Sequence, residues 1–259
     1  MTVVDRSPCD DHRWLVANRA DLWEPARVVA VDREASGTTL RLRLAQPPDV
    51  LAGQYYLVRL VIDRPPGEVQ QAYSLSSSPS PLTTDVEITV REVLGGRASP
   101  ILARRVQVRD LLQVRGPFGF LTWNEADGGP LGLIGAGSGV APLVSIVRYA
   151  TARHLDTPMT MLCSSRDRRS VLLRAPLDEL HHRQRWFKLV HTFTRSQRDP
   201  IARYHRRIDA DMLAEVMESG DLAAWTFYVA GPADMVLAVR TMLGALGADD
   251  DRIYSEDHA

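Results

Sequence analysis

The chain has 259 residues, of which 45% are hydrophobic, and this is enough for two modest domains or one large one. Lysine and arginine number 31 against 32 aspartates and glutamates, so no overall charge would recruit nucleic acid or an acidic membrane surface. Two cysteines, Cys9 and Cys163, are too few for a four-cysteine iron–sulfur centre or zinc site, and we predict no metal site.

Residues 1–22 show no periodic pattern, and we predict that they form a loose N-terminal arm. They lack the basic and then apolar segments of a signal peptide. We therefore expect a soluble, cytoplasmic protein that is a monomer and has no membrane or nucleic-acid partner.

Residues 23–122 are predicted to form a small β-barrel. Aliphatic residues alternate with arginine or other polar residues over 26–35, 38–45, 55–62 and 85–93. Alternation at period two indicates half-buried antiparallel strands, and the Gly, Pro and Ser breaks between them favour a barrel.

Two stretches of this half suggest a ligand. In "QAYSLSSSP" (71–79), Tyr73 and Ser74 set an aromatic face beside a hydroxyl, which together can pack a planar ring and bond its edge. In "VREVLGGRAS" (90–99), two glycines precede a short predicted helix whose N-terminus can hold an anion. Serines and glycines are also ordinary turn residues, so a purely structural interpretation stays open for each stretch.

Residues 123–259 change to a repeated pattern of apolar strand followed by helix, after a predicted linker at "WNEADGGP" (123–130). Helices are predicted over Val140–Arg153, Ala175–Arg183, Asp209–Met217 and Ala233–Leu243. This repetition favours a parallel sheet covered on both faces. The expected fold class is α+β with two domains: an N-terminal antiparallel Greek-key β-barrel and a C-terminal α/β domain with a parallel sheet.

The stretch "LIGAGSGVAPLVSIV" (133–147) places three glycines at every second position between a strand and a helix. Its glycines, serines and proline make a poor membrane helix. A nucleophile elbow around Ser138 would need glycines where Ala136 and Val140 stand. The G-x-G-x-x-G dinucleotide fingerprint spaces its last glycine differently. A phosphate-binding loop, with Pro142 in the first helical turn, and a structural turn are the two interpretations left.

Histidines and arginines elsewhere in the chain suggest other functions. His181 and His182 are adjacent and so point in different directions, which favours a solvated helix face over a metal site. No serine in the sequence lies in the kind of turn that a Ser/His/Asp hydrolase needs. A basic stretch near residue 205 is either plain surface or a docking site for an acidic electron carrier. Its members are Arg203, Tyr204, His205, Arg206 and Arg207.

Taken in order, these motifs resemble those of the ferredoxin–NADP reductase superfamily of flavoproteins over residues 23–259. The flavin motif R-x-Y-S-x-x-S is matched by Tyr73, Ser74 and Ser77, and the flavin-phosphate motif G-G-x-x-S by Gly95, Gly96 and Ser99. The pyridine-nucleotide motif G-x-G-x-G-x-x-P is matched in full by Gly135, Gly137, Gly139 and Pro142. "GPFGF" (116–120), "YVAGPADMV" (228–236) and "IYSEDHA" (253–259) resemble further family segments.

The resemblance implies a site between the two halves. The implied domains are 1–22 (arm), 23–122 (FAD-binding barrel) and 123–259 (NAD(P)-binding domain). In the barrel, the implied cofactor-binding residues are Gln71, Ala72, Tyr73, Ser74, Ser77, Val90, Arg91, Gly95, Gly96, Arg97, Ala98 and Ser99. In the second half, they are Gly135, Gly137, Ser138, Gly139, Pro142, Ser165, Arg166, Arg174, Arg195, Gly231, Pro232 and Met235. The implied catalytic residues are Ser74, Glu256 and His258.

Three positions depart from the family pattern. Gln71 stands where the family has an arginine that pairs with the flavin phosphate. The neutral side chain should weaken flavin binding unless Arg97, Arg91 or Arg59 takes the place of that arginine. Ala230 replaces a cysteine near the nicotinamide, and His258 replaces an aromatic ring that covers the flavin.

The implied function is an oxidoreductase that takes a hydride from NAD(P)H onto non-covalent FAD and passes electrons to an external carrier such as a ferredoxin. Ser165 and Arg166, with Arg174 and Arg195 as second supports, favour NADPH, whereas Asp167 leaves NADH open. Two alternatives stay open: a reductase of a small acceptor (free flavin, quinone or ferric chelate) and a non-catalytic nucleotide-binding descendant.

Overall fold

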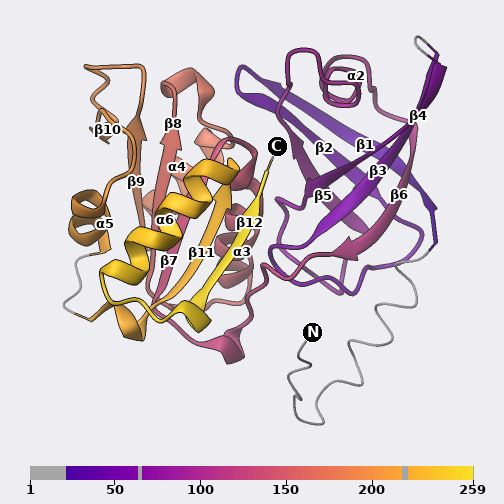
Figure 1. Cartoon of the computed structure of the whole chain (residues 1–259). Coiled ribbons are helices and arrows are strands. Elements are labelled where there is room, and N and C mark those ends of the chain that lie inside the picture. The colour runs from indigo at the N-terminus through magenta and orange to yellow at the C-terminus, as the bar shows by residue number, and fades with distance from the viewer. Residues whose placement is uncertain (1–21, 64–65, 218–220, 259) are drawn as a thin grey trace, which may run out of the picture.

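The alternating strands of the N-terminal half form one six-stranded antiparallel sheet with the order β4-β3-β6-β1-β2-β5. The structure is a computed structural model that describes residues 22–63, 66–217 and 221–258 (Figure 1). The predicted arm, 1–22, lies outside these residues except for Leu22. The elements of this half are β1 (Glu24–Glu34), β2 (Gly37–Arg43), β3 (Tyr55–Asp63), β4 (Pro66–Ser74), β5 (Asp85–Val90), α2 (Ser99–Arg104) and β6 (Leu111–Phe118).

The sheet closes into the predicted barrel just beyond the end of β4. Leu75 forms a bridge with Ile88 of β5, and Ser76 N donates to Glu87 O at 2.8 Å. Strand β6 returns to lie between β1 and β3, which is the Greek-key connection. Every second residue points inward, and the interior is filled by fully buried aliphatic side chains such as Val28, Leu40 and Val58.

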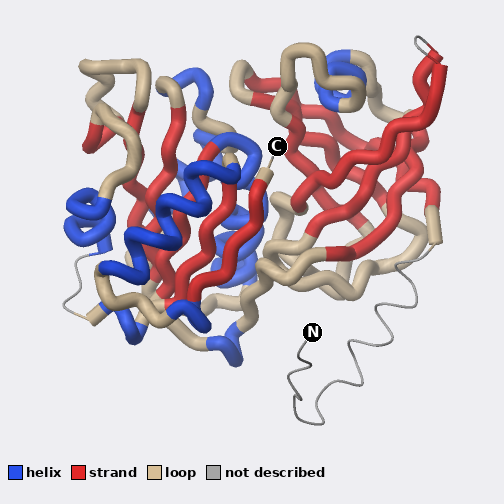
Figure 2. The backbone as a smooth tube through the Cα atoms, in the orientation of Figure 1, coloured by secondary structure: helices blue, strands red, loops and turns tan. Residues whose placement is uncertain are grey.

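The C-terminal half is a six-stranded parallel sheet with the order β10-β9-β8-β7-β11-β12. Its strands are β7 (Leu131–Ala136), β8 (Met159–Ser165), β9 (Phe187–Phe193), β10 (Ala202–Tyr204), β11 (Thr226–Gly231) and β12 (Ile253–Asp257). Its helices are α3 (Val140–Ala152), α4 (Arg174–Arg183), α5 (Ala210–Met217) and α6 (Ala233–Ala245), and they lie on both sides of the sheet (Figure 2). The predicted fold class is therefore confirmed.

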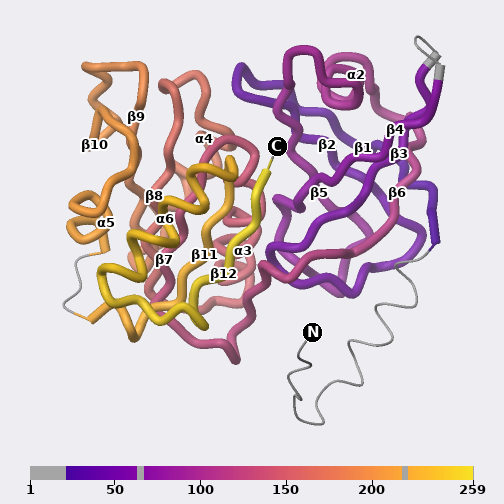
Figure 3. Tube along the Cα trace, viewed as in Figure 1, coloured from indigo at the N-terminus to yellow at the C-terminus, as the bar shows by residue number. Residues whose placement is uncertain are grey.

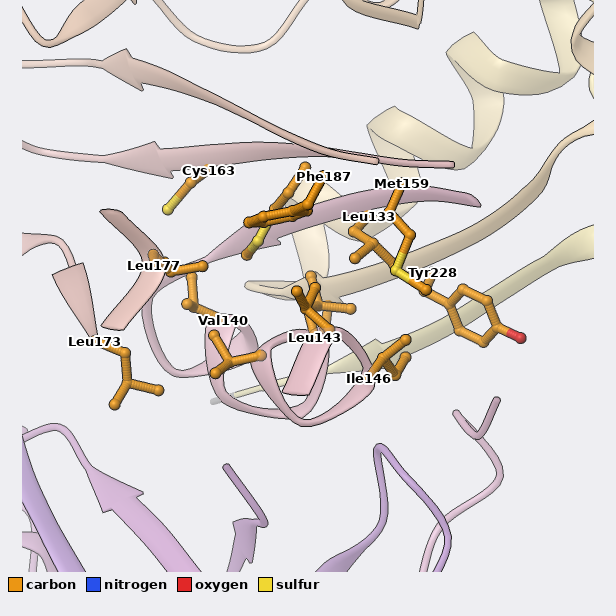
Figure 4. Close-up of a cluster of buried hydrophobic side chains, with 14 of the residues drawn as sticks. Leu133, Val140, Leu143, Ile146, Met159, Cys163, Leu173, Leu177, Phe187 and Tyr228 are labelled. Atoms are coloured by element: carbon orange, nitrogen blue, oxygen red, sulfur yellow. The ribbon is translucent and has the colours of Figure 1, made fainter. Parts of the chain in front are cut away.

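Alternation along the buried strands divides the core of this half into two layers. Leu133 and Tyr228 face α3 and α4, where Leu143 and Leu177 pack against them (Figure 4). The next residues along the strands face α5 and α6 on the opposite side. The α3 layer also includes Trp123, which is 1% exposed, so the predicted linker begins with a packed core residue.

The predicted helices agree with the observed ones to within two residues at each end. The pattern did not indicate β10, an edge strand of only three residues, or β12, an edge strand in which one residue of five is buried. Among the described residues, no helix is both long and apolar enough to cross a membrane.

Residues 135–139, called the glycine loop below, connect β7 to α3 at the point where the strand order reverses. A Cβ on Gly139 would lie 2.2 Å from the carbonyl oxygen of Ala230 and 2.5 Å from the nitrogen of Gly231. A Cβ on Gly135 would meet Leu143 at 2.8 Å, and Gly137 has a φ of +59°. The fold itself therefore requires glycine at position 139, and the positive φ of Gly137 also favours glycine, independently of any ligand.

His191 is a buried polar residue of β9 whose two ring nitrogens have no hydrogen-bond partner among the described residues. Its side chain is 5% exposed, and Cys163 lies beside it in register on β8. Burial, the largest cause, lowers the pKa of the His191 imidazole from the ordinary 6.5. The same burial raises the pKa of the Cys163 thiol to about 12, so neither group is charged at neutral pH.

Replacing Gly139 by alanine should severely destabilise the C-terminal half, because the added methyl group would overlap backbone atoms that cannot rotate away. The matched control is Gly244→Ala in α6, where nothing lies within 4 Å of the added carbon. That control should stabilise the protein by about 0.5–1 kcal/mol. Chemical denaturation followed by circular dichroism measures both. Equal stability of the two variants would contradict this account of the loop.

His191→Leu should remove part of the acid sensitivity of the fold. Because the pKa is lowered in the native state, the unfolded chain binds a proton below pH 6.5 that the native imidazole does not bind. The free energy of unfolding therefore decreases as the pH is lowered. The stability of His191→Leu relative to the parent should therefore increase from pH 7.5 to 5.5, by at most about 1.4 kcal/mol per pH unit. The exposed His182→Leu is the control. A pH-independent difference between parent and His191→Leu would exclude this linkage.

Candidate functional site

The predicted residues of the C-terminal half gather at one edge of the parallel sheet. The glycine loop follows β7, Ser165 ends β8, Gly231 ends β11 and Glu256 lies near the end of β12. Parallel strands place their carboxyl ends together, and ligands of such sheets bind where the strand order reverses, which here is between β8, β7 and β11. Pro142 lies in the first turn of α3, and Pro232 is the N-cap residue of α6.

The C-terminal strand brings Glu256 and His258 to the glycine loop. Strand β12 pairs with β11 so that Glu256 lies opposite Ala230, and the backbone N–H of His258 donates to Gly231 O at 2.8 Å. The imidazole Nε2 lies 2.9 Å from Glu256 Oε1, and Nδ1 lies 3.2 Å from Ser138 Oγ. Figure 3 shows this end of the chain between the two halves of the molecule. The structure thus joins two of the three predicted catalytic residues directly.

On the barrel side, Tyr73 and Ser74 end β4 and are both buried. Tyr73 lies opposite Tyr56, and its side chain is 9% exposed. The Tyr73 hydroxyl is buried without a partner among the described residues. Burial raises the pKa of this phenol above its ordinary value, so the hydroxyl is neutral and available as a donor. A buried donor without an acceptor is costly, which indicates a ligand atom at this position.

The second barrel motif forms a tight turn at the start of α2. Ser99 Oγ accepts a hydrogen bond from Val93 N at 3.1 Å, and a Cβ on Gly96 would lie 2.8 Å from that Oγ. Gly95 has a φ of +77°. Ala98 is the N-cap residue and has no capping side chain. The turn therefore leaves the N-terminus of α2 without a side-chain acceptor of its own.

The structure separates the three arginines considered as substitutes for an arginine at position 71. Gln71 pairs with Val58, so Arg59 points to the opposite face of the sheet, where its guanidinium lies 4.5 Å from the Trp23 ring centroid. Arg59 therefore does not lie on the face of the sheet that carries Gln71. Arg97, in contrast, reaches the Gln71 face of β4, because its Nη2 lies 3.5 Å from the position of a Cβ on Gly67.

Arg91 lies across the junction between the two halves. Its Nη1 would be 2.8 Å from a Cβ on Gly137, so the guanidinium covers the open side of the glycine loop. Burial, the largest cause, and the neighbouring Arg166 lower the pKa of Arg91. The Asp167 carboxylate, in the same pocket, opposes this shift. A half-buried arginine near a second arginine favours the binding of an anion.

A pocket of about 480 Å³ lies at this junction, between the β1–β2 hairpin and the loop after β8. Its lining includes five arginines (Arg33, Arg91, Arg104, Arg166 and Arg169) and three carboxylates (Glu34, Glu92 and Asp167). Arg33 donates to the carbonyls of Ala103 and Val106, and Arg104 pairs with Glu92. Of the other three arginines, Arg91 also covers Gly137, whereas Arg166 and Arg169 come from the loop after β8.

The loop after β8 contains the residues predicted to select the nucleotide. Arg166 and Arg195 are exposed and adjacent, because Arg195 N donates to Arg166 O at 2.8 Å. Ser165 is 8% exposed, and its hydroxyl has no partner among the described residues. The carboxylate of Asp167 accepts from Ser170 N at 2.9 Å and caps its own turn. Arg174 instead pairs with Asp178 at 3.4 Å, so it is the weakest of the predicted supports.

The basic stretch near residue 205 is largely neutralised. Arg203 pairs with Glu215, Arg206 pairs with Asp209, and Tyr204 is 7% exposed. This favours plain surface over a docking site. Across the described ranges, no three histidine, cysteine or acidic side chains gather as metal ligands would.

Sequence reasoning missed the residues that connect the two halves. Ser145 Oγ donates to Ser77 O at 2.7 Å. Arg148 Nη1 donates to Ser76 O at 2.7 Å and to Glu87 Oε2 at 2.9 Å. The only available signal was a serine and an arginine three residues apart on an otherwise apolar helix, and such a pair has many interpretations.

Comparison with known proteins agrees with this arrangement. A family model described as "Oxidoreductase FAD-binding domain" matches residues 29–123, and one described as "Oxidoreductase NAD-binding domain" matches residues 133–241. The reductase component of a naphthalene 1,2-dioxygenase system from Pseudomonas putida, a ferredoxin–NAD(P)(+) reductase, is 28% identical over 221 residues. The match covers 84% of this chain and 63% of that relative.

Two further similarities come from Amycolatopsis. The reductase subunit of an aromatic O-demethylase is 32% identical over 76% of this chain and 57% of its own length, so this chain spans well under two thirds of that relative. The crystal structure of the cytochrome P450 reductase GcoB superposes with a TM-score of 0.78 and 27% identity, covering 91% of this chain and 69% of that one. With one FAD-binding and one NAD-binding oxidoreductase domain on the observed two-part fold, the chain belongs to the ferredoxin–NADP reductase superfamily.

Proposed function

We propose that this chain is an FAD-dependent NAD(P)H oxidoreductase that passes electrons to an external one-electron carrier such as a ferredoxin. The observation that carries the proposal is the contact between the element that follows the glycine loop and the segment that follows Tyr73 and Ser74. Helix α3 begins at the glycine loop and is hydrogen-bonded to Ser76 and Ser77, which follow Tyr73 and Ser74 almost directly. The similarity to the reductase component of a dioxygenase system and to the reductase subunit of an aromatic O-demethylase supports the same function.

The residues present fit a bound FAD. The unpartnered Tyr73 hydroxyl and the buried Ser74 would hold the ring system and its ribityl chain, and the turn at Gly95–Ser99 would hold the pyrophosphate at the start of α2. We assign the role of the missing arginine at position 71 to Arg97, because Arg97 reaches the same face of β4. When bound, the flavin supplies hydride acceptance followed by transfer of single electrons.

The glycine loop and the arginines near it fit a dinucleotide. The N-terminus of α3 would receive the pyrophosphate, and Arg91, which covers Gly137, lines the same pocket as Arg166. Ser165, Arg166 and Arg195 would hold a ribose 2′-phosphate, while the Asp167 carboxylate is engaged in its own turn. These features support NADPH as the preferred donor.

Glu256 and His258 would act at the nicotinamide end. Glu256 lies opposite Ala230, the position where the family has a cysteine, and it holds the imidazole of His258. That imidazole also bonds Ser138 in the glycine loop, so a nucleotide that uses Ser138 has to displace it. In this proposal Glu256 orients the nicotinamide, and the His258 side chain leaves when the nucleotide binds.

The purified protein should be yellow and contain FAD that heating or acid releases, because the barrel motifs are complete apart from position 71. Anaerobic NADPH should bleach the flavin absorbance, and a ferredoxin-type carrier should restore it. Visible spectroscopy and mass spectrometry of the released cofactor measure this. A colourless protein that takes up no added FAD would refute the proposed function, and equal reoxidation by small acceptors alone would refute the role of the carrier.

Arg166→Ala should raise the KM for NADPH by about ten- to a hundred-fold, because a charge-assisted hydrogen bond contributes about 1.5–3 kcal/mol. The KM for NADH should change less than about twofold, since NADH lacks the 2′-phosphate. Arg183→Ala, which removes an exposed arginine paired with Glu179 at the end of α4, is the control. Steady-state kinetics with both donors measures the effect. Equal changes for NADPH and NADH would remove Arg166 from the 2′-phosphate site.

A further inference from the structure

Helix α3 presents two polar side chains to the barrel on one face. Ser145 is completely buried, and its hydroxyl donates to Ser77 O at 2.7 Å. Arg148, one turn later, donates to Ser76 O at 2.7 Å and to the Glu87 carboxylate at 2.9 Å. All three acceptors belong to the barrel, so these bonds cross from one half of the molecule to the other.

The acceptors are themselves held rigidly within the barrel. Ser76 N donates to Glu87 O, and Glu87 N donates to Ser77 Oγ at 3.0 Å. The Ser76 hydroxyl lies 2.9 Å from that of Thr89. The carboxylate of Glu87 also pairs with Arg41 at 2.7 Å. The segment that follows Ser74 is therefore fixed to β5 before α3 contacts it.

These contacts connect the glycine loop to the segment after Ser74 through a single short helix. The glycine loop leads directly into α3, and α3 reaches Ser76 and Ser77 within three turns. Neither Ser145 nor Arg148 belongs to a motif predicted to touch a cofactor. Hydride transfer requires donor and acceptor atoms to be held about 3–3.5 Å apart, and an error of about 1 Å lowers the rate roughly a hundred-fold.

We propose that Ser145 and Arg148 are positioning residues that set the separation between the flavin and nicotinamide sites without binding either cofactor. This inference rests on the proposed function. The carbonyls of Ser76 and Ser77 are the fixed points on the flavin side, and the backbone of α3 carries the nicotinamide side. The Arg148 guanidinium donates to two different acceptors of the barrel, Ser76 O and Glu87 Oε2. Two acceptors fix the orientation of α3 as well as its position.

The test compares substitutions that remove these bonds but keep the packing. Arg148→Met keeps the unbranched apolar stem of the side chain and removes the guanidinium, and Glu87 still has Arg41 as its partner, so the barrel should fold. Arg148→Lys keeps the charge and one donor direction. The matched control is Arg153→Met, which removes a pair with Glu125 just beyond the end of α3 and touches no barrel strand.

Anaerobic stopped-flow reduction of the bound flavin by NADPH should show a limiting rate that is about ten- to a hundred-fold lower in Arg148→Met. The dissociation constants of NADPH and FAD should stay within about twofold of the parent. Arg148→Lys should recover part of the rate, Ser145→Ala should lose several-fold, and Arg153→Met should match the parent.

A second measurement does not depend on turnover. NADP+ added to the oxidised protein should perturb the visible flavin bands less in Arg148→Met than in the parent, at equal saturation determined by calorimetry. An unchanged limiting rate, or a loss explained entirely by weaker FAD or NADPH binding, would overturn the inference alone. A parent protein that binds no FAD, or whose flavin NADPH does not reduce, would overturn the proposed function and the inference with it.

Discussion

The C-terminal half depends on one close approach of backbone to backbone, between Gly139 and the peptide that joins Ala230 to Gly231. This contact fixes the path of the chain as it leaves β7, and therefore the direction in which α3 begins. Because β11 carries Ala230, and β12 pairs with β11, the same contact determines where Glu256 lies relative to the glycine loop. A side chain at position 139 would separate these elements, so glycine is required before any ligand is considered.

The direction of α3 then determines how the two halves meet. The helix is apolar on the side that faces its own sheet, where Val140, Leu143 and Val147 are buried. Its remaining side reaches the barrel through hydrogen bonds to main-chain carbonyls and one carboxylate. Main-chain acceptors cannot change rotamer, so such bonds define a geometry more strictly than a contact between two long side chains would. Arg91 completes the junction from the barrel side.

Features with a regular period were predictable from the sequence, and those that depend on a partner distant in the chain were not. Helix α3 follows from its apolar face, and the glycine loop follows from its position between strand and helix. The buried role of Trp123 was not predictable, because its surroundings come from α3 and from Ala52, far away along the chain. The orientation of Arg59 depends on strand register, which a run of alternating residues leaves free by one residue.

The candidate site shows the same limit. Its motifs could be assigned by spacing, including Tyr73, Ser74 and the three loop glycines. Which arginine faces which phosphate site required the register of β4 and the packing of the junction. Arg91 and Arg97 are six residues apart, yet one reaches the glycine loop and the other reaches the start of β4. No local pattern distinguishes these two environments.

The two sides of the candidate site differ in local stability, because one of them is formed by strand β12. It lies at the edge of the parallel sheet, pairs with β11 alone among the described strands, and buries only Ile253 of its five residues. Such an edge strand can detach locally at a much smaller free-energy cost than global unfolding, whereas β7 and β11 lie in the most protected part of the sheet. We therefore expect the amide hydrogens from Ser255 to His258 to exchange with solvent through a local fluctuation that leaves the glycine loop intact. Glu256 and His258 would then detach and reattach without the loop that they contact, so the two sides of the site differ in how long they stay in place.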